Sequence, residues 1–440
     1  MIEQMKPSGI DWIGEVPSSW KMLKLKYFSY LKGRIGWQGL TADEFIDEGP
    51  YLITGTDFEN GRIQFDRSYH ISEERYAQAP EIQLKIGDLL VTKDGTVGKM
   101  AYVDELPGQA SLNSHLLLIR PLKNRYDNRF LFWLMSSTVF TGYTDYSQDG
   151  TIMASLSQEK IGNFIAYFPT VDEQVKIADY LDTKCSKLDS IIADLEKQID
   201  TLQKYKKSLI TETVTKGLDK SAPMKDSGIE WIGQIPEHWI VQPIKYRADF
   251  YNGDRGENYP SKSEILNEGV PFINAGHLCD GGLDMESMDY ISEEKYRLMG
   301  GVKLQNGDIV YCLRGSIGKN SILDIDRGTV ASSLVALRSK NIVPKYLYYS
   351  INSHIEEVQR FLWDNGTAQP NLSAENLGKF KICIPSKEEQ LTIVSFLDEK
   401  CALVDQILFE TRKQLEKIQQ HKKSLIYEYV TGKKRVTEVK

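Results

Sequence analysis

The sequence predicts an α+β protein in which two homologous mixed α/β domains are separated by an antiparallel two-helix coiled coil with pseudo-two-fold symmetry. A stretch that begins at Pro169 recurs without a gap from Pro385, 216 residues later, and the segments that precede the two copies are also related to each other. Each copy lacks helix breakers over most of its length. The expected segments are a first domain at 1–168, a first helix at 169–217, a second domain at 218–384, a second helix at 385–432 and a basic tail at 433–440.

Both copies of the central stretch are predicted to be single long helices. Thr170 with Glu173, and Ser386 with Glu389, have the spacing of a capping box. Apolar residues then recur at steps of three and four, which is the pattern of a coiled-coil seam. In the first copy they are Leu181, Cys185, Leu188, Ile192, Leu195, Ile199, Leu202 and Leu209, with Lys206 in the same frame, and in the second copy Lys422 takes the equivalent place. At 1.5 Å per residue, each helix would be roughly 60 Å long.

Composition and charge limit the possible functions. The chain has 440 residues, of which 41% are hydrophobic and 26% charged, and no apolar run is long enough to span a membrane. The first residues lack a signal-peptide pattern, and the five cysteines form no CxxC pair. We therefore expect a cytoplasmic protein without a metal site, a cofactor or a disulfide framework. The net charge is −7, whereas nucleic-acid-binding proteins are usually basic. DNA binding would require locally concentrated basic residues or a partner that shares the phosphate contacts.

Two further repeats define the domains. Residues 5–14 recur at 224–233, each followed by a proline and a tryptophan (Trp20, Trp239), which we expect to pack where a domain meets a helix end. A Gly-Asp pair, a short apolar segment and a glycine turn also recur, at 87–99 and 307–319. The Asp94-Gly95 pair predicts a hairpin turn. Residues 30–60 and 250–280 diverge, as expected for one fold that carries different binding loops.

The order of the segments predicts their geometry. If the ends of the second domain lie close together, as is usual for domains, the two helices must run antiparallel and bring the C-terminus near the N-terminus. Cys185 and Cys401, equivalent by repeat, would then lie near opposite ends of the helix pair. Two binding modules on a spacer suit a two-part target, and modules on one face of B-DNA lie about 34–36 Å apart or at a multiple of that distance.

The chain resembles the specificity subunit of Type I restriction-modification enzymes over nearly its whole length. The Pro-x-x-x-Glu-Gln helix starts, the Lys-Lys-Ser-Leu-Ile helix ends at 206–210 and 422–426, the glycine segments and the Gly-Thr…Leu-Ser segments at 150–157 and 366–373 carry this resemblance. It implies two target recognition domains, each of which reads one half of a split, asymmetric sequence in double-stranded DNA. It also implies a complex with two DNA-methyltransferase subunits and, optionally, two restriction subunits.

Candidate DNA-binding residues lie in polar, glycine-rich loops. Arginine can read guanine, lysine and hydroxyl side chains often bind phosphates, and asparagine and glutamine suit adenine. The candidates are Thr54, Thr56, Lys93, Thr96, Lys99, Asn113, His115, Asn274, His277, Arg314, Ser316, Lys319 and Gln369. For the hairpin residues, a solvated turn remains an equal alternative, and His115 is as consistent with a structural histidine.

No catalytic motif appears in the sequence. Methyltransferase and Walker motifs and HExxH are absent, and the Gly95–Lys99 segment is too short for a phosphate loop. We therefore expect a DNA-binding subunit without catalytic residues. Two alternatives remain: a two-headed coiled-coil scaffold that binds proteins and not DNA, and a duplicated enzyme.

Overall fold

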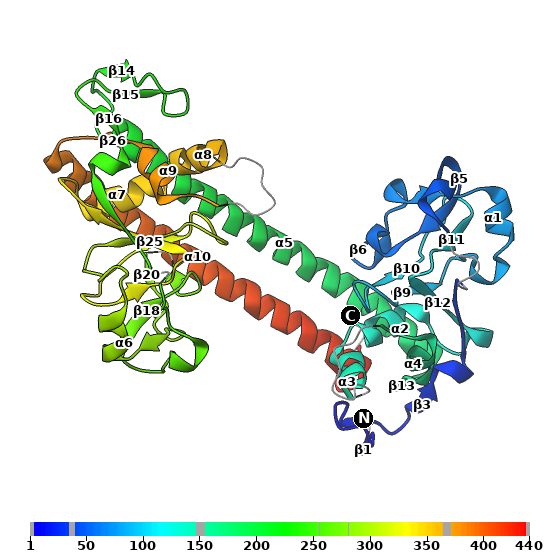
Figure 1. The fold of residues 1–440 in the computed structure, drawn as a ribbon. Helices are drawn as coiled ribbons and strands as arrows, with labels where there is room; N and C mark the ends of the chain where they lie inside the picture. Colours follow the sequence, from blue (N-terminus) through cyan, green and yellow to red (C-terminus); the bar gives the residue numbers. More distant parts are fainter. Residues whose placement is uncertain are drawn as a thin grey trace. The chain divides into compact units, whose positions relative to one another are not determined.

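The computed structural model describes residues 4–34, 40–146, 155–254, 256–279, 281–363 and 371–436. The chain divides into two compact units, and we describe each by itself. Unit 1 contains Met1–Leu195 and Lys413–Lys440, and unit 2 contains Glu196–Arg412. Two long helices, α5 (Val171–Lys216) and α10 (Lys387–Val430), each contribute one segment to either unit (Figure 1). Unit 1 is therefore built from both ends of the chain.

Unit 1 is a mixed α/β unit. Its strands are β1 (Met5–Pro7), β2 (Glu15–Pro17), β3 (Lys21–Lys24), β4 (Ser29–Gly33), β5 (Ile46–Ile53), β6 (Phe58–Glu59), β7 (Arg62–Ile63), β8 (Tyr69–His70), β9 (Leu89–Thr92), β10 (Met100–Tyr102), β11 (Ala110–Leu112), β12 (Leu116–Pro121) and β13 (Ile165–Phe168). Its short helices are α1 (Glu73–Ala77), α2 (Asn128–Met135), α3 (Thr138–Tyr146) and α4 (Gln158–Asn163).

The central sheet of unit 1 has the antiparallel order β10-β9-β12-β4. Both of its faces are covered, which explains why β9 reads as a continuous apolar run. Leu89 and Val91 face the core that contains α2 and the long helices, whereas Leu90 faces a second core beneath the sheet β11-β5-β8. The predicted Gly-Asp…strand–turn–strand pattern is thus the β9–β10 hairpin.

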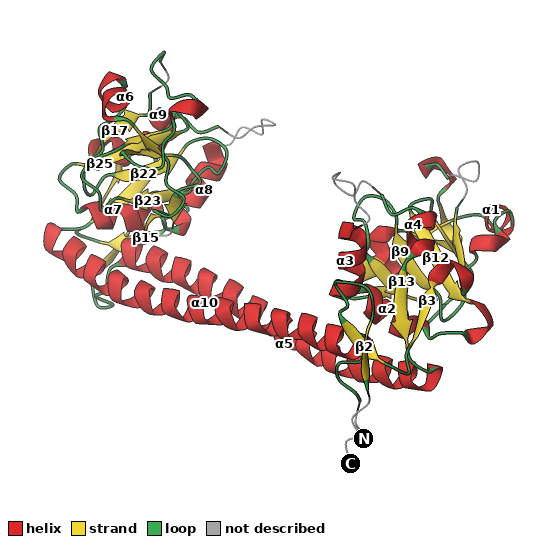
Figure 2. Ribbon diagram, turned by 90° about the horizontal axis from the view of Figure 1, so that it is seen from below, coloured by secondary structure: helices red, strands yellow, loops and turns green. Residues whose placement is uncertain are grey.

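Unit 2 repeats this arrangement. Its strands are β14 (Met224–Asp226), β15 (Gln234–Pro236), β16 (Ile240–Pro243), β17 (Ala248–Asn252), β18 (Val270–Ile273), β19 (Leu278–Cys279), β20 (Gly282–Leu283), β21 (Tyr290–Ile291), β22 (Ile309–Cys312), β23 (Asn320–Ile322), β24 (Thr329–Val330), β25 (Leu334–Ser339) and β26 (Lys381–Ile384). Its short helices are α6 (Glu293–Leu298), α7 (Pro344–Ile351), α8 (His354–Trp363) and α9 (Ala374–Lys379). The sheet β17-β25-β22-β23 (Figure 2) and the sheet β21-β18-β24 have the strand orders of their unit 1 counterparts; Figure 2 labels the strands of the first sheet. The sequence repeat is therefore a repeat of the fold.

The start of each long helix is fastened to its own domain by the glutamine of the Glu-Gln pair. Gln174 is buried; its Nε2 donates to Pro169 O (2.9 Å) and its Oε1 accepts from the backbone N–H of Asp127 (2.8 Å). Gln390 makes the equivalent bonds to Pro385 O (3.1 Å) and from the N–H of Val343 (2.9 Å). A buried amide with both ends bonded fixes the direction in which the helix leaves the domain.

The end of each long helix packs on the repeated tryptophan. In unit 1, the last turns of α10, including Tyr429 and Val430, enter the core that contains Trp20. In unit 2, Val214 of α5 enters the core that contains Trp239. Trp20 and Trp239 are therefore packing elements at helix ends, as expected. The repeat is imperfect at its other tryptophan, since Trp231 is exposed.

The two long helices contact each other in an antiparallel sense within each unit. In unit 1, the rings of Tyr180 and Tyr429 lie 4.5 Å apart, and Lys422 forms an ion pair with Asp189. In unit 2, Lys206 Nζ lies 2.7 Å from Asp405 Oδ1. The two lysines predicted within the apolar seam are thus tolerated because each meets a carboxylate on the opposite helix.

The sequence also made predictions about the cysteines and about membrane-spanning helices. Cys185 and Cys401 belong to the cores of different units and are both free thiols. Across the part of the chain that the structure describes, no helix combines the length and apolar character needed to cross a bilayer.

The contact between Gly432 and the Trp20 segment gives a stability prediction. Gly432 and Gly9 both have a φ of 72°, but a Cβ at Gly432 would clash with the ring of Pro17 and lie 3.0 Å from Trp20 Cζ2, whereas nothing lies within 4 Å of a Cβ at Gly9. Backbone strain from alanine is thus common to both sites. Gly432→Ala should lower the free energy of unfolding by about 1–3 kcal/mol more than Gly9→Ala, because only position 432 is overpacked. Urea unfolding of both variants measures the difference, and equal losses would contradict the packing role.

Candidate DNA interface

The two glycine turns adopt the same conformation in both units. Between β9 and β10, Gly95 and Gly98 have φ values of 72° and 84°, and between β22 and β23, Gly315 and Gly318 have 75° and 90°. The N–H of Gly98 donates to Thr92 O, and the N–H of Gly318 donates to Cys312 O. These positive φ values explain the spacing of the glycines, because other residues rarely adopt them. Each turn presents its neighbouring side chains at one end of the central sheet.

A lysine joins each glycine turn to a second loop. Lys99 Nζ donates to Gly55 O (3.2 Å), and Lys319 Nζ donates to Ala275 O (2.9 Å). The turns at 54–57 and 274–277 are therefore neighbours of the glycine turns, although each lies about forty residues away in sequence. Both lysines hold loops together, and their remaining N–H donors can still serve a ligand. We call residues 54–57, 93–99 and 113–115 the loop edge of unit 1, and 274–277 with 314–319 the loop edge of unit 2.

Most of the other candidates of unit 1 lie on this loop edge. Thr96 is exposed and Lys93 half-buried, and the N–H of Lys93 donates to His115 O (2.7 Å). His115 Nδ1 lies 3.5 Å from Asp94 Oδ2, and 63% of its side chain is exposed. Asn113 is partly committed, because its Oδ1 accepts from the His115 N–H. Lys93, Thr96 and His115 thus project from one surface.

Thr54 and Thr56 have a local structural role as well. Thr54 N donates to Asp57 Oδ2 (2.7 Å), and the hydroxyls of Thr54 and Thr56 are hydrogen-bonded (2.6 Å). Burial raises the pKa of the Asp57 carboxyl, although the hydrogen bonds from Thr54 oppose this shift. Thr54 is the N-cap of this turn, and the exposed Thr56 side chain remains accessible at the loop edge.

In unit 2, Arg314 and Ser316 are exposed. A base-reading His277 would be expected to be exposed as well, but its position differs. The His277 ring is buried, with Nδ1 accepting from the N–H of Asn274 (3.2 Å) and Nε2 lying 3.6 Å from Asp289 Oδ2. A ring enclosed in this way positions Asn274. Arg314 Nε donates to Asn371 Oδ1 (3.4 Å). Gln369 lies outside the described residues.

The structure brings further residues to these edges that the sequence pattern did not indicate. In unit 1, Arg34 and Ser155–Gln158 border a hollow of about 360 Å³ beside Lys93 and Asp94. Arg34 is buried and donates to Leu112 O (2.8 Å) and Ser111 Oγ (3.1 Å). Burial lowers the pKa of its guanidinium to about 10, so the group stays charged at neutral pH. In unit 2, Arg360, Phe361 and Trp363 border the glycine turn. Leu156 and Ser157 belong to the repeated Leu-Ser segment, whereas Arg34, Arg360, Phe361 and Trp363 belong to no repeated motif.

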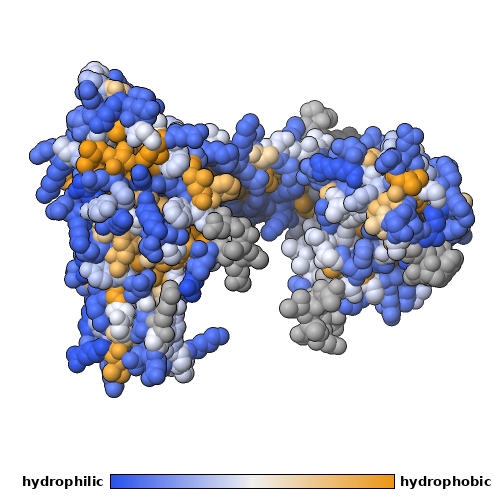
Figure 3. All heavy atoms as spheres, turned by 45° about the horizontal axis from the view of Figure 1, so that its top comes forward, coloured by the Kyte–Doolittle hydropathy of each residue, from blue (hydrophilic) through white to orange (hydrophobic). Residues whose placement is uncertain are grey.

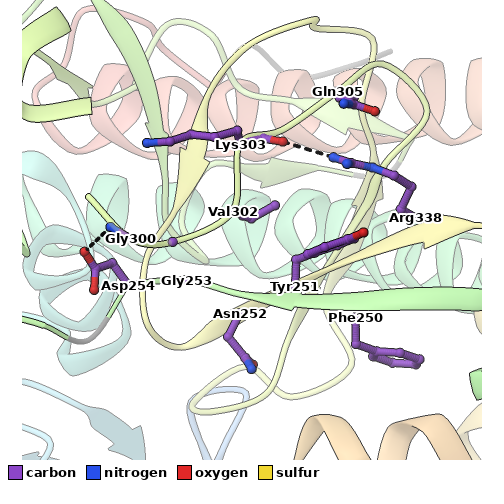
Figure 4. A pocket seen from close by; sticks show the side chains of 11 residues that line it. Phe250, Tyr251, Asn252, Gly253, Asp254, Gly300, Val302, Lys303, Gln305 and Arg338 are labelled. Atoms are coloured by element: carbon purple, nitrogen blue, oxygen red, sulfur yellow. Dashed lines mark hydrogen bonds between the residues drawn. The ribbon is translucent and has the colours of Figure 1, made fainter. Parts of the chain in front are cut away.

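A cavity of about 580 Å³ in unit 2 is lined by charged groups that are bonded to the protein itself (Figure 4). Asp254 Oδ2 accepts from the N–H of Gly300 (2.9 Å), and Arg338 makes two hydrogen bonds to Asp308 at 2.9 and 2.8 Å. Lys303 Nζ donates to Met299 O (3.1 Å), and burial lowers its pKa. These groups stabilise the walls of the cavity. Among the described residues, no three His, Cys, Asp or Glu side chains gather in a cluster that could hold a metal ion.

Comparisons with known proteins identify relatives over the whole chain. Residues 17–201 and 248–420 match the Type I restriction modification DNA specificity domain. The Type I restriction enzyme MjaVIII specificity subunit of Methanocaldococcus jannaschii is 26% identical, over 96% of this chain and 94% of its own length. The EcoBI specificity subunit of Escherichia coli is 23% identical, over 78% and 73%. A solved chain from a study of complex assembly and conformational transition of the type I R-M system superposes with a TM-score of 0.64 at 17% identity, covering 95% of this chain and 99% of that chain, and so has a similar fold.

The contacts of Asn274 predict that this residue stabilises its loop. Its Nδ2 donates to Asp289 Oδ2 (2.9 Å) and its Oδ1 accepts from the N–H of Gly276 (2.7 Å). Asn274→Ala should lower the free energy of unfolding by about 1–3 kcal/mol, because it leaves these groups without partners. Ser316→Ala, at an exposed position of the same loop edge, should change it by less than about 0.5 kcal/mol. Urea unfolding distinguishes the two, and a neutral Asn274→Ala would assign this side chain no structural role.

Proposed function

This chain belongs to the Type I restriction modification DNA specificity family, and we propose that it is the subunit that reads a two-part, asymmetric DNA target, one half-site per unit. One observation carries the proposal: both units present the same two-loop edge, but with different side chains. In both units, the lysine of the glycine turn donates a hydrogen bond to a backbone carbonyl of the neighbouring loop. Lys99 donates to Gly55 O, and Lys319 donates to Ala275 O. At equivalent positions of this repeat, Asp94 and Thr96 in unit 1 correspond to Arg314 and Ser316 in unit 2, and Lys93 corresponds to Leu313.

The chemistry of the loop edges supports DNA as the ligand. Lysine ammonium groups and hydroxyls bind phosphate oxygens, while arginine donates two hydrogen bonds to guanine in the major groove. Arg314 is exposed, and its Nε donates to Asn371 Oδ1 at the long distance of 3.4 Å, so the guanidinium can turn to a base. Different side chains on equal frames should recognise different half-sites, which is why an asymmetric target is expected.

We propose that α5 and α10 form one continuous antiparallel coiled coil that separates the half-sites. The ion pairs Lys206–Asp405 and Lys422–Asp189 are equivalent by the 216-residue repeat. Equal ion pairs in the two units support a single register along both helices and a pseudo-two-fold relation between the units. Cationic seam residues specify register at some expense of stability. The length of the helices would then set the number of base pairs between the half-sites.

The charge balance supports an assembly rather than a lone DNA-binding protein. With a net charge of −7, the chain needs partners that share the phosphate contacts. We propose two DNA-methyltransferase subunits, with two restriction subunits in a complete system, acting in the cytoplasm, and we assign catalysis to them. Exposed apolar residues on α10, Leu403 and Phe409, are candidate contacts for these partners.

The proposal is tested by mapping methylated adenine in the genome of a host that expresses this chain with its cognate methyltransferase. A split motif should appear that is absent when this chain is withheld. Exchange of residues 21–168 for the same region of a relative should change one half of the motif, because each unit has its own loop edge. A change in both halves would contradict independent reading, and no motif with an active methyltransferase would favour a protein-binding scaffold.

Arg314 and Lys319 should contribute differently to DNA affinity. In the assembled complex, Arg314→Ala should weaken target binding by about 1–3 kcal/mol and relax preference at one position of the second half-site. Lys319→Ala should weaken all sequences and reduce the slope of log K against log salt by about 0.9. Lys204→Ala removes the same charge from an exposed site on α5 outside both loop edges and serves as the control. Salt titrations of binding to target and scrambled duplexes give both quantities; equal effects of all three variants would assign no specific contact.

A further inference from the structure

The C-terminal end of α8 exposes an unusual group of apolar side chains. Phe361 is 78% exposed, Leu362 55% and Trp363 39%. On the face that Figure 3 shows, hydrophilic residues cover most of the surface and apolar residues form separate patches. Contiguous exposed aromatic residues are rare on soluble proteins and usually mark a binding surface. Because these residues are not buried, core packing does not explain them.

These side chains border a cavity that opens at the loop edge of unit 2. The cavity has a volume of about 280 Å³, with Phe361 and Trp363 on one side and Gly315, Ser316 and Ile317 on the other. It thus lies next to Arg314, the residue best suited to reading a base. A ligand that reaches the glycine turn would meet the aromatic rings.

Arg360 is held rigidly in the wall of this cavity. Its Nε donates to Glu356 Oε1 (3.0 Å), and the hydroxyl of Tyr311 donates to the same buried carboxylate. Burial acts to lower the pKa of Arg360, but Glu356, Tyr311 and Glu357 together raise it, so the guanidinium remains charged. A Cβ at Gly318 would lie 2.9 Å from Arg360 Nε, so glycine allows the turn to rest on the guanidinium. The cavity therefore combines aromatic faces with a preorganised cation.

The equivalent positions of unit 1 carry different residues. The repeat aligns without a gap from Ser137 and Ser353 onward, and both hydroxyls donate to the carbonyl three residues earlier. At this alignment, Thr144 and Asp145 stand where unit 2 has Arg360 and Phe361. A partner protein that docks equally on both units would find this surface only once. An asymmetric DNA target, in contrast, presents a different half-site to each unit and needs this surface only once. The single occurrence therefore favours DNA as the occupant.

We propose that Phe361 and Trp363 stack on an unstacked base of the half-site read by unit 2, with that base entering the cavity beside Arg360. This inference rests on the proposed function and adds a mode of readout to it. Aromatic and apolar side chains that enter a base step unstack it and kink the duplex, and arginine can hydrogen-bond an exposed base. The second half-site should accordingly contain an easily opened step, such as pyrimidine–purine, because deformation is least costly there.

The test uses the assembled complex with its methyltransferase and duplexes carrying the mapped target. 2-Aminopurine replaces adenine at single positions in either half-site, and permanganate reports unstacked thymines. On binding, fluorescence or reactivity should rise at one position of the second half-site. Phe361→Ala should abolish this signal and weaken target binding roughly 5- to 100-fold, the range expected for one base stack. Phe361→Tyr should retain both, and Asp145→Ala, the equivalent position of unit 1, should change neither.

The possible outcomes separate this inference from the proposed function. If Phe361→Ala and Trp363→Ala bind the target with unchanged affinity and unchanged base signals, the stacking inference is overturned while DNA reading stands. If Phe361→Ala instead disrupts assembly with the methyltransferase, as measured by mass photometry, the surface docks a protein and the inference is again overturned. If the unaltered complex binds target and scrambled duplexes equally, it is the proposed function that fails.

Discussion

The packing of each long-helix end on a buried tryptophan is the contact on which the architecture depends. Trp20 shares a core with the last turns of α10, and Trp239 shares one with the last turns of α5. Each helix therefore begins in the domain that precedes it, where Gln174 or Gln390 fixes it, and ends in the core of the other unit. Because a core residue contributes about 1.5–3 kcal/mol by burial, neither domain can keep its full core without the distant helix.

This arrangement separates the stable parts of each unit from the parts that vary. The central sheets are buried on both faces, and the glycine turns and their lysine contacts recur in both units. Exposed side chains of the loop edges, such as Ser316 and Arg314, are not constrained by core packing, and the side chains at such positions differ between the units. A scaffold of this kind permits a change of binding specificity without loss of stability, as is common where function lies on loops supported by a rigid framework.

The two units also differ in what surrounds their glycine turns. Unit 1 places the buried cation of Arg34 next to a polar hollow, whereas unit 2 places Arg360 beside exposed aromatic rings. The same arrangement of strands and glycine turns therefore carries two surfaces of different chemistry. A polar, cationic edge suits hydrogen bonding to an intact duplex, and an aromatic edge suits stacking.

Local patterns in the sequence determined the long helices with their caps and the positions of the glycine turns, because capping boxes, heptad spacing and positive φ depend on residues within a few positions of one another. The repeat itself determined that the chain contains one fold twice. Tertiary structure decided which carboxylates accept Lys206 and Lys422, that His277 is enclosed while His115 is exposed, and that Lys99 and Lys319 hold neighbouring loops. It also decided that Arg360 and Phe361 border the turn of unit 2. These features depend on contacts between residues that are distant in sequence. The packing of the whole unit selects the partners, and no local sequence pattern indicates them.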